Sequence, residues 1–273
     1  MTTPLKVAIS GAAGRMGIAL IKALSAHPTL ELTACGIRPG SETLAMSQFE
    51  HAGVAFASEM MVDDPAKLYA NADAVIDFSA PEHAAQLAQY AADAGGGRIL
   101  VSGTTGLNTA QKEAIIRCGE RAKLVLSANM SIGVNLMMAL VEHASSKLGN
   151  EFDIEVLEMH HRHKVDAPSG TAYALGAAAA RGRGVILGDV WSKAREGHTG
   201  PRVPGSIGFA ALRGGDVIGE HTVIFAGLGE RLELTHKATS RDIFAKGALV
   251  AVEWAAKKPN GFYSMRDVVK PEA

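Results

Sequence analysis

A dense group of ionisable side chains lies near the middle of the chain, in the stretch EMHHRHKVDAPSGTA at residues 158–172. It contains His160 and Lys164, and a histidine can give or take a proton near neutral pH. The Pro-Ser-Gly-Thr that follows has the pattern of a helix start, where first-turn N–H groups, here those of Gly170 and Thr171, attract an anion. These residues therefore predict a proton donor beside a binding site for a carboxylate.

The same stretch has two other interpretations. His161 and His163 could be a pair of metal ligands, but a third ligand would have to come from Glu158 or Asp166, and no cysteine lies near them. The stretch could also be a solvated basic loop. We favour the proton donor with a carboxylate site and predict no metal. If the strand that precedes the histidines continues through them, His160, Arg162 and Lys164 share one face and His161 and His163 the other.

The second motif is the glycine-rich sequence GAAGRMG at residues 11–17, between a strand-like segment and a helical one. Gly11 permits a tight turn, Gly14 lets backbone N–H groups approach a pyrophosphate, and Gly17 permits close packing of the helix on the strand. A glycine-rich turn without a ligand is the alternative, but the strand before it and the helix after it favour a dinucleotide. The predicted cofactor contacts in this motif are Gly11, Ala12, Ala13, Gly14, Arg15 and Met16.

The end of the next predicted strand, ACGIRPGS, bears on the choice of cofactor. An acid at this place usually binds the ribose 2′-hydroxyl of NAD, whereas here Arg38 is present and no acid follows until Glu42. A guanidinium suits a 2′-phosphate, so we expect NADPH to be preferred over NADH, unless Arg38 is a solvated surface residue.

Two later segments, VSGTTG and LSANMS, also follow predicted strands. Ligands of open α/β sheets bind outside the carboxyl ends of the strands, so both segments are placed to reach the nicotinamide end of the cofactor, although either could be an ordinary loop. Their predicted contacts are Gly103, Thr104, Thr105, Ser127, Ala128, Asn129 and Met130.

Two patterns of secondary structure must position these residues. Up to about residue 130, apolar strands alternate with helices, which predicts a parallel sheet with helical crossovers. Residues 203–240 are predicted to form strands joined by glycine turns in a largely antiparallel sheet. We therefore expect an α/β protein with a Rossmann-type, dinucleotide-binding domain at residues 1–130 and 241–273. A smaller α+β domain at 131–240 would serve substrate binding and oligomerisation.

The expectation of an oligomer comes from the second sheet. The predicted helices are enough to cover only one of its faces, and an open sheet face is usually covered by another subunit. We therefore predict a homo-oligomer formed through residues 203–240.

The composition limits the classes of function. The chain has 273 residues, of which 47% are hydrophobic and 20% charged, and its formal net charge is -1, so nothing draws it generally to nucleic acid or to an anionic membrane. Cys35 and Cys118 lie far apart in the sequence, which argues against a disulfide framework and fits a reducing compartment. Because the N-terminal residues lack the features of a signal peptide and no apolar run is long enough to span a bilayer, we expect a cytoplasmic protein.

These motifs resemble those of a known family, the 4-hydroxy-tetrahydrodipicolinate reductases, also called dihydrodipicolinate reductases. The resemblance runs through nearly the whole chain, and HHRHKVDAPSGTA is its most specific part. It implies NAD(P)H-dependent reduction of the cyclic dicarboxylate (2S,4S)-4-hydroxy-2,3,4,5-tetrahydrodipicolinate to (S)-2,3,4,5-tetrahydrodipicolinate in lysine and diaminopimelate biosynthesis. It also implies a homotetramer built on the second domains. The segments that carry it are GAAGRMG, VSGTTG, SANMSIGVN, EMHHRHKVDAPSGTA and REGHTGPRVPGSIGFAALRGGDVIGEHTV.

The resemblance also implies roles for individual residues. His160 would be the proton donor and acceptor, Lys164 a second proton donor, and His161 a contact of the substrate. Gly170 and Thr171 would hold a carboxylate of the substrate.

Two positions depart from the family pattern. Ile37 stands where a glutamate precedes the arginine, which weakens the case for NADH, and Ala13 replaces a glycine in the turn. The rival functions are another two-domain oxidoreductase, such as an amino-acid or semialdehyde dehydrogenase, a nucleotide sensor without catalytic activity, and a metal-dependent hydrolase.

Overall fold

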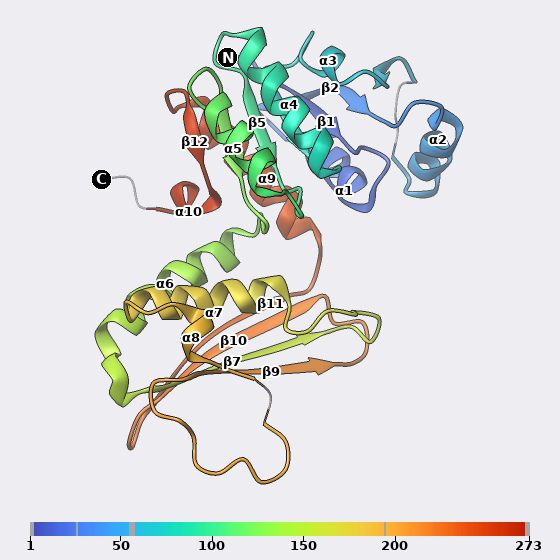
Figure 1. The fold of residues 1–273 in the computed structure, drawn as a ribbon. Helices are drawn as coiled ribbons and strands as arrows, with labels where there is room; N and C mark the ends of the chain where they lie inside the picture. Colours follow the sequence, from blue (N-terminus) through green and yellow to red (C-terminus); the bar gives the residue numbers. More distant parts are fainter. Residues whose placement is uncertain (1–2, 26, 55–57, 194, 271–273) are drawn as a thin grey trace. The chain divides into compact units, whose positions relative to one another are not determined.

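The structure is a computed structural model that describes residues 3–25, 27–54, 58–193 and 195–270. The chain forms two compact units, one made of Met1–Ile132 and Arg241–Ala273 and the other of Gly133–Ser240. Each unit contains a sheet of its own (Figure 1).

The first unit is built on a parallel sheet, as predicted from the alternation of strands and helices. Six of its strands follow the order 3-2-1-4-5-6 of the Rossmann fold, and a seventh pairs with β6 at one edge. Across the sheet, the strands are β12 (Gly261–Tyr263), β6 (Lys123–Leu126), β5 (Ile99–Ser102), β4 (Ala74–Asp77), β1 (Leu5–Ser10), β2 (Leu30–Gly36) and β3 (Met61–Val62).

Helices cover both faces of this sheet. In β1, Val7 and Ile9 pack against one helical layer, which includes α1 and α9, whereas Ala8 packs against the other, which includes α4 and α5. Because both faces are buried, the strands are apolar at successive positions rather than at alternate ones. The helices described in this unit are α1 (Arg15–Ser25), α2 (Glu42–His51), α3 (Pro65–Leu68), α4 (Pro81–Ala94), α5 (Thr109–Cys118), α9 (Asp242–Ala256) and α10 (Met265–Val268), with a 3-10 turn η1 (Ser58–Met60).

The second unit contains a five-stranded mixed sheet, in which the predicted antiparallel pairing is present and a parallel part is added. β10 is antiparallel to β11 and β7, but β9 is parallel to β7 and to β8. The reason is that β7, far earlier in the sequence, lies between β9 and β10, so the glycine turn at 214–215 joins strands that are not neighbours. In order, the strands are β11 (Arg231–Ala238), β10 (Gly219–Ala226), β7 (Asp153–His160), β9 (Ile207–Arg213) and β8 (Trp191–Ser192).

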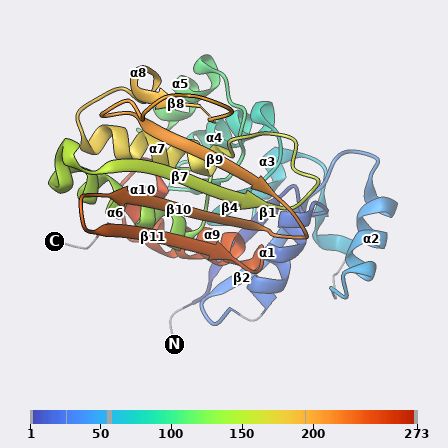
Figure 2. The same cartoon turned by 90° about the horizontal axis from the view of Figure 1, so that it is seen from below.

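Helices cover one face of the second sheet, and Figure 2 shows its other face in front of them. Burial alternates along β10, since His221, Val223 and Phe225 are buried on the helical side and the residues between them are only partly buried. The helical elements are α6 (Ile132–Leu148), η2 (Gly149–Glu151), α7 (Gly170–Gly182) and α8 (Leu187–Val190). In the part of the chain that the structure describes, none of the helices has the length and apolar character needed to cross a bilayer.

Candidate active site

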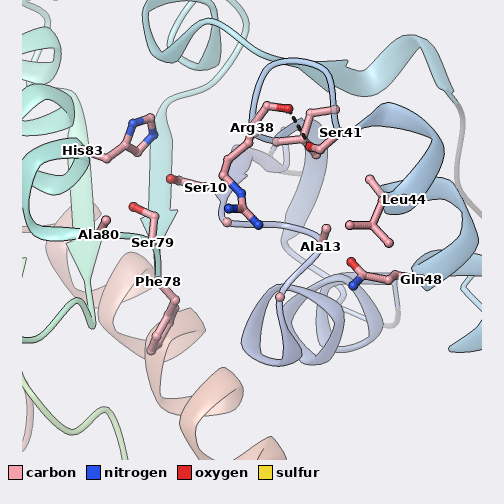
Figure 3. Close-up of a pocket in the computed structure, with 15 residues that line it drawn as sticks. Ser10, Ala13, Arg38, Ser41, Leu44, Gln48, Phe78, Ser79, Ala80 and His83 are labelled. Carbon is pink, nitrogen blue, oxygen red and sulfur yellow. Dashed lines mark hydrogen bonds between the residues drawn. The ribbon is translucent and has the colours of Figure 1, made fainter.

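A cavity of about 460 Å³ lies at the carboxyl ends of β1, β2 and β4 in the first unit (Figure 3). β1 and β4 are neighbours in the sheet. From β1 the strand order continues to β2 and β3 on one side, and from β4 it continues to β5 and β6 on the other. In open α/β sheets this is the place where ligands bind. Of the predicted cofactor residues, the cavity is lined by Gly11, Ala13, Gly14 and Arg38.

The glycine turn packs too tightly for larger residues. Gly11 has a φ of 75°, and a Cβ on it would lie 2.8 Å from the carbonyl oxygen of Phe78. A Cβ on Gly17 would lie 2.3 Å from the carbonyl oxygen of Ala12. The N–H of Gly14 donates to the carbonyl of Gly11 at 3.0 Å, which closes the turn just before α1 begins. The turn therefore brings backbone, rather than side chains, to the edge of the cavity.

Arg38 reaches into this cavity from the loop after β2 (Figure 3). Its carbonyl oxygen accepts hydrogen bonds from the N–H and the hydroxyl of Ser41, at 3.1 and 2.5 Å, which hold the loop. The hydroxyl of Ser10, also in the cavity wall, is buried and has no hydrogen-bond partner among the described residues. A guanidinium, an orphaned hydroxyl and a glycine cradle fit a phosphorylated nucleotide.

The two other predicted cofactor segments follow β5 and β6, at the same edge of the sheet. Met130 is only 1% exposed and Ala12 is fully buried, so the structure exposes neither residue to a ligand. Ser127 is tied to its own loop, because its hydroxyl donates to the carbonyl of Asn129 at 2.9 Å.

Asp77, which no motif in the sequence marks, organises the segment at 103–105. Its buried carboxylate accepts hydrogen bonds from the hydroxyls of Ser79, Ser102 and Thr104, at 2.5, 2.8 and 2.7 Å. The Thr104 hydroxyl in turn accepts a hydrogen bond from the N–H of Ser79 at 3.1 Å. The side chain of Thr104 therefore anchors its loop.

In the second unit, His160 is the last residue of β7 and is 8% exposed. Its Nδ1 lies 2.5 Å from Oε2 of Glu158. Burial alone would raise the pKa of Glu158, but hydrogen bonds from Arg213 and His160 hold it below its ordinary value. The carboxylate is therefore ionised and can only accept, which places a proton on Nδ1 of His160 and leaves Nε2 for exchange.

Because β7 ends at His160, the idea that the strand continues through the histidines is wrong. The N–H of His161 donates to the carbonyl of Val217 at 2.7 Å, and the chain then turns into a loop. In that loop Lys164 donates to both carboxylate oxygens of Asp166, at 2.7 and 2.9 Å. This hydrogen bonding lowers the pKa of Asp166. Lys164 therefore carries a counter-ion that an anionic ligand could replace.

The predicted helix start is present as α7. Its N-cap is Ser169, whose hydroxyl accepts from the N–H of Ala172 at 3.1 Å. Gly170 is exposed at the first turn, and a Cβ there would meet no atom within 4 Å. The first-turn N–H groups thus lie where a small anion can approach.

His221 completes the surroundings of His160. The two rings meet edge to face, with centroids 5.1 Å apart, and Nε2 of His221 lies 3.0 Å from the Ser169 hydroxyl. Burial lowers the pKa of His221 to about 4, and the charges of His160 and Lys164 add to this effect. His221 is therefore neutral at physiological pH and holds the N-cap of α7 in place.

The described residues do not provide the ligand cluster that the metal interpretation requires. The rings of His161 and His163 have centroids 6.2 Å apart. Among the described residues, no group of three or more His, Cys, Asp or Glu side chains could hold a metal ion.

A nucleotide cavity in one unit and a proton-transfer group in the other are the two parts that a nicotinamide-dependent oxidoreductase needs, and we assign the chain to that class. Comparison with known proteins makes the assignment narrower. The family model for the N-terminus of dihydrodipicolinate reductase matches residues 5–130, and the model for its C-terminus matches residues 133–269. The chain therefore belongs to the dihydrodipicolinate reductase family.

Individual relatives agree with this assignment. A 4-hydroxy-tetrahydrodipicolinate reductase of Rhizobium rhizogenes is 50% identical over 267 residues, which cover 97% of this chain and 96% of the relative. A relative from Mesorhizobium japonicum with the same name is 49% identical over 263 residues, covering 96% and 95%. The structure of dipicolinate-bound dihydrodipicolinate reductase from Paenisporosarcina sp. TG-14 shares the fold, with a TM-score of 0.77, 23% identity and coverage of 96% of this chain and 98% of that one.

Proposed function

We propose that this chain catalyses the NAD(P)H-dependent reduction of (2S,4S)-4-hydroxy-2,3,4,5-tetrahydrodipicolinate to (S)-2,3,4,5-tetrahydrodipicolinate, a step of lysine and diaminopimelate biosynthesis. The observation that carries the proposal is His160, held through Nδ1 by an ionised Glu158 in a chain of this family. The relatives named above are reductases of this kind, and one solved member of the fold binds dipicolinate.

His160 gives and takes the proton at the substrate through Nε2, because Nδ1 is committed to Glu158. Lys164 is a second proton donor, and its ammonium also stabilises negative charge on the substrate when it exchanges Asp166 for the ligand. The N–H groups at Gly170 and Thr171 hold one carboxylate of the substrate at the start of α7. His161 contacts the substrate from the same loop.

The first unit is the dinucleotide-binding domain, and its glycine turn, Arg38 and the segments at 103–105 and 127–130 hold the cofactor. When bound, the nicotinamide supplies a hydride. Arg38 favours NADPH over NADH, since a guanidinium suits the 2′-phosphate and Ile37 brings no acid for a 2′-hydroxyl.

The second unit is the substrate-binding and oligomerisation domain, and the enzyme is a homotetramer of the cytoplasm. The sheet face away from α6 and α7 supports the assembly (Figure 2). The free thiols of Cys35 and Cys118 support a reducing compartment.

The experiment is a coupled assay in which the freshly made precursor is offered with NADPH or NADH. We expect turnover with both and a higher kcat/KM with NADPH. His160→Ala and Lys164→Ala should each lower kcat by about 10²-fold or more, the usual contribution of a general acid or base. His163→Ala, an exposed histidine of the same loop, is the matched control and should keep wild-type turnover. Wild-type rates in His160→Ala would remove this residue from catalysis.

A further inference from the structure

Glu158 is the most buried charged group near the candidate catalytic residues. It lies two residues before His160 on β7, and its side chain is 1% exposed. Its Oε2 accepts from His160 Nδ1 at 2.5 Å and from Arg213 at 2.9 Å. Its Oε1 accepts from Arg213 at 2.9 Å and from the N–H of Ser169 at 3.1 Å. The carboxylate thus accepts four hydrogen bonds, which is about its full capacity.

These bonds reach three separate parts of the candidate site. His160 stands at the end of β7, and Ser169 is the N-cap of α7. Arg213, at the end of β9, also donates to the carbonyl oxygen of Asp166 at 2.6 Å, and thereby ties down the loop that carries Lys164. One carboxylate therefore joins the imidazole, the lysine loop and the helix N-terminus.

The space beside the other nitrogen of His160 is kept open by glycine. A Cβ on Gly219 would lie 3.0 Å from His160 Nε2. The imidazole is thus fixed on its Nδ1 side by Glu158 and is left with a small neighbour on the side that would exchange a proton. A buried ion pair with a structural role alone would not require this arrangement.

We propose that Glu158 is a positioning residue for the reduction, one that sets the tautomer and orientation of His160 and, through Arg213 and Ser169, aligns the Lys164 loop and the start of α7. The proposal rests on the function proposed above for His160 and Lys164. Glu158 itself touches no substrate and acts through the groups it holds. It binds them as the carboxylate of a catalytic triad holds its histidine.

The test is Glu158→Gln, which keeps the size of the side chain. One carboxylate oxygen becomes an NH₂ group, and in either orientation of the amide this group faces a donor of Arg213, so at least one hydrogen bond from Arg213 is lost. We expect kcat to fall by about 10²-fold with a smaller change in KM, because the proton transfer loses its alignment. Binding of NADPH should stay unchanged, since the nucleotide cavity lies in the other unit.

Glu142→Gln is the matched control. Glu142 also accepts two hydrogen bonds from an arginine, Arg181, but in a more exposed pair on the helices of the same unit. This variant should turn over at the wild-type rate. Equal losses of kcat in both variants would overturn the proposal, because they would reflect general destabilisation.

A readout independent of turnover is the ¹⁵N spectrum of the histidines, with His160 assigned through His160→Gln. In the wild type at neutral or higher pH we expect His160 with its proton on Nδ1, and in Glu158→Gln a mixture of both tautomers. An unchanged tautomer together with unchanged kcat would sink the idea. If the wild type does not reduce the precursor at all, the proposed function fails, whereas the spectrum still decides whether Glu158 sets the tautomer.

A second variant covers the case in which Glu158→Gln does not fold. Glu158→Gln alone leaves the charge of Arg213 without its carboxylate partner. The double variant Glu158→Gln, Arg213→Met removes this unpaired charge, because both side chains of the pair are then neutral. We expect this protein to fold and to bind NADPH, yet to keep the low kcat and the mixed tautomer. Recovery of kcat in the double variant would show that Glu158 has only a structural role.

Discussion

Arg38 is the residue on which the predicted choice of cofactor depends. In Arg38→Ala the cavity loses the guanidinium that suits a 2′-phosphate, and a hydrogen bond to a charged group is worth about 1.5–3 kcal/mol. We therefore expect the KM for NADPH to rise by about 10- to 100-fold and that for NADH to stay nearly constant. Arg117→Ala, an exposed arginine of α5, is the control. An equal rise for both cofactors would contradict recognition of the 2′-phosphate.

His221 makes a prediction about stability and pH. Its pKa lies at about 4 in the folded protein, because burial disfavours the charged ring, against an ordinary value of 6.5. Below pH 6.5 the unfolded chain takes up a proton that the folded protein does not bind, so stability falls as the pH drops from 6.5 toward 4. In His221→Gln, which still accepts from Ser169, the free energy of unfolding should fall less across this window. His236, whose pKa burial also lowers, retains part of the slope.

The measurement is denaturant unfolding of both proteins at several pH values between about 7 and about 5. His198→Gln, in an exposed loop of the same unit, should keep the full dependence. Parallel curves for the wild type and His221→Gln would show that His221 does not stay neutral on folding.

At the scale of residues, the sequence indicated groups that lie close together in the chain. His160, Lys164 and the helix start at Gly170 all fall within one short stretch, and local patterns suffice to find them. The partners of His160 could not be found in this way. Arg213 meets Glu158 only because β9 pairs with β7 in parallel, and nothing local marks an arginine before Gly-Gly as the partner of a carboxylate 55 residues earlier.

At the scale of elements, the contact between α1 and the turn before it allows a sharp test. In Gly17→Ala, the new Cβ would lie 2.3 Å from the carbonyl oxygen of Ala12, and backbone atoms cannot move aside as a flexible side chain can. We expect a loss of about 1–3 kcal/mol in stability and weaker binding of NADPH, because the turn must shift. Unfolding and nucleotide titration measure the two effects.

Gly188→Ala is the control for that change. Gly188 is also helical, in α8, but a Cβ there would meet no atom within 4 Å. Alanine favours a helix over glycine by about 1 kcal/mol, so this variant should be as stable as the wild type or more so. A Gly17→Ala protein that matches it would mean that the turn is not tightly packed.

Helices and strands were predictable where their apolar residues recur at a regular spacing or where a characteristic residue marks their first turn. α4 begins at Pro81, a residue type that favours the first turn of a helix, and the parallel strands of the first unit are apolar runs in the sequence. Local patterns did not predict α2, whose face carries only a few buried residues, such as Ala45 and Phe49. They also did not predict the short β3 and β12, which exist through pairing with a neighbour. The position of β7 between β9 and β10 was also beyond local patterns, since the order of strands depends on tertiary packing.

At the scale of the whole molecule, the second sheet decides whether the chain acts alone. Its face away from the helices carries apolar residues of β7, β9 and β10, together with charged residues of β11 and, on β7, the ion-paired Asp153 and Glu155. Leu212 is 48% exposed there, and Leu157 and Ile224 are only partly buried. A face of this kind is usually covered, and closed symmetry lets identical faces cover one another.

We therefore expect a tetramer in sedimentation equilibrium and a smaller species in the variant Ile224→Glu. A charge at this position would be buried without a partner if the faces meet, and a buried unpaired charge costs several kcal/mol. Ile186→Glu, which places the same charge on an exposed residue next to α8, on the helical side, should remain a tetramer. A wild-type monomer, or a tetramer that survives Ile224→Glu and dissociates in Ile186→Glu, would assign the assembly to another surface.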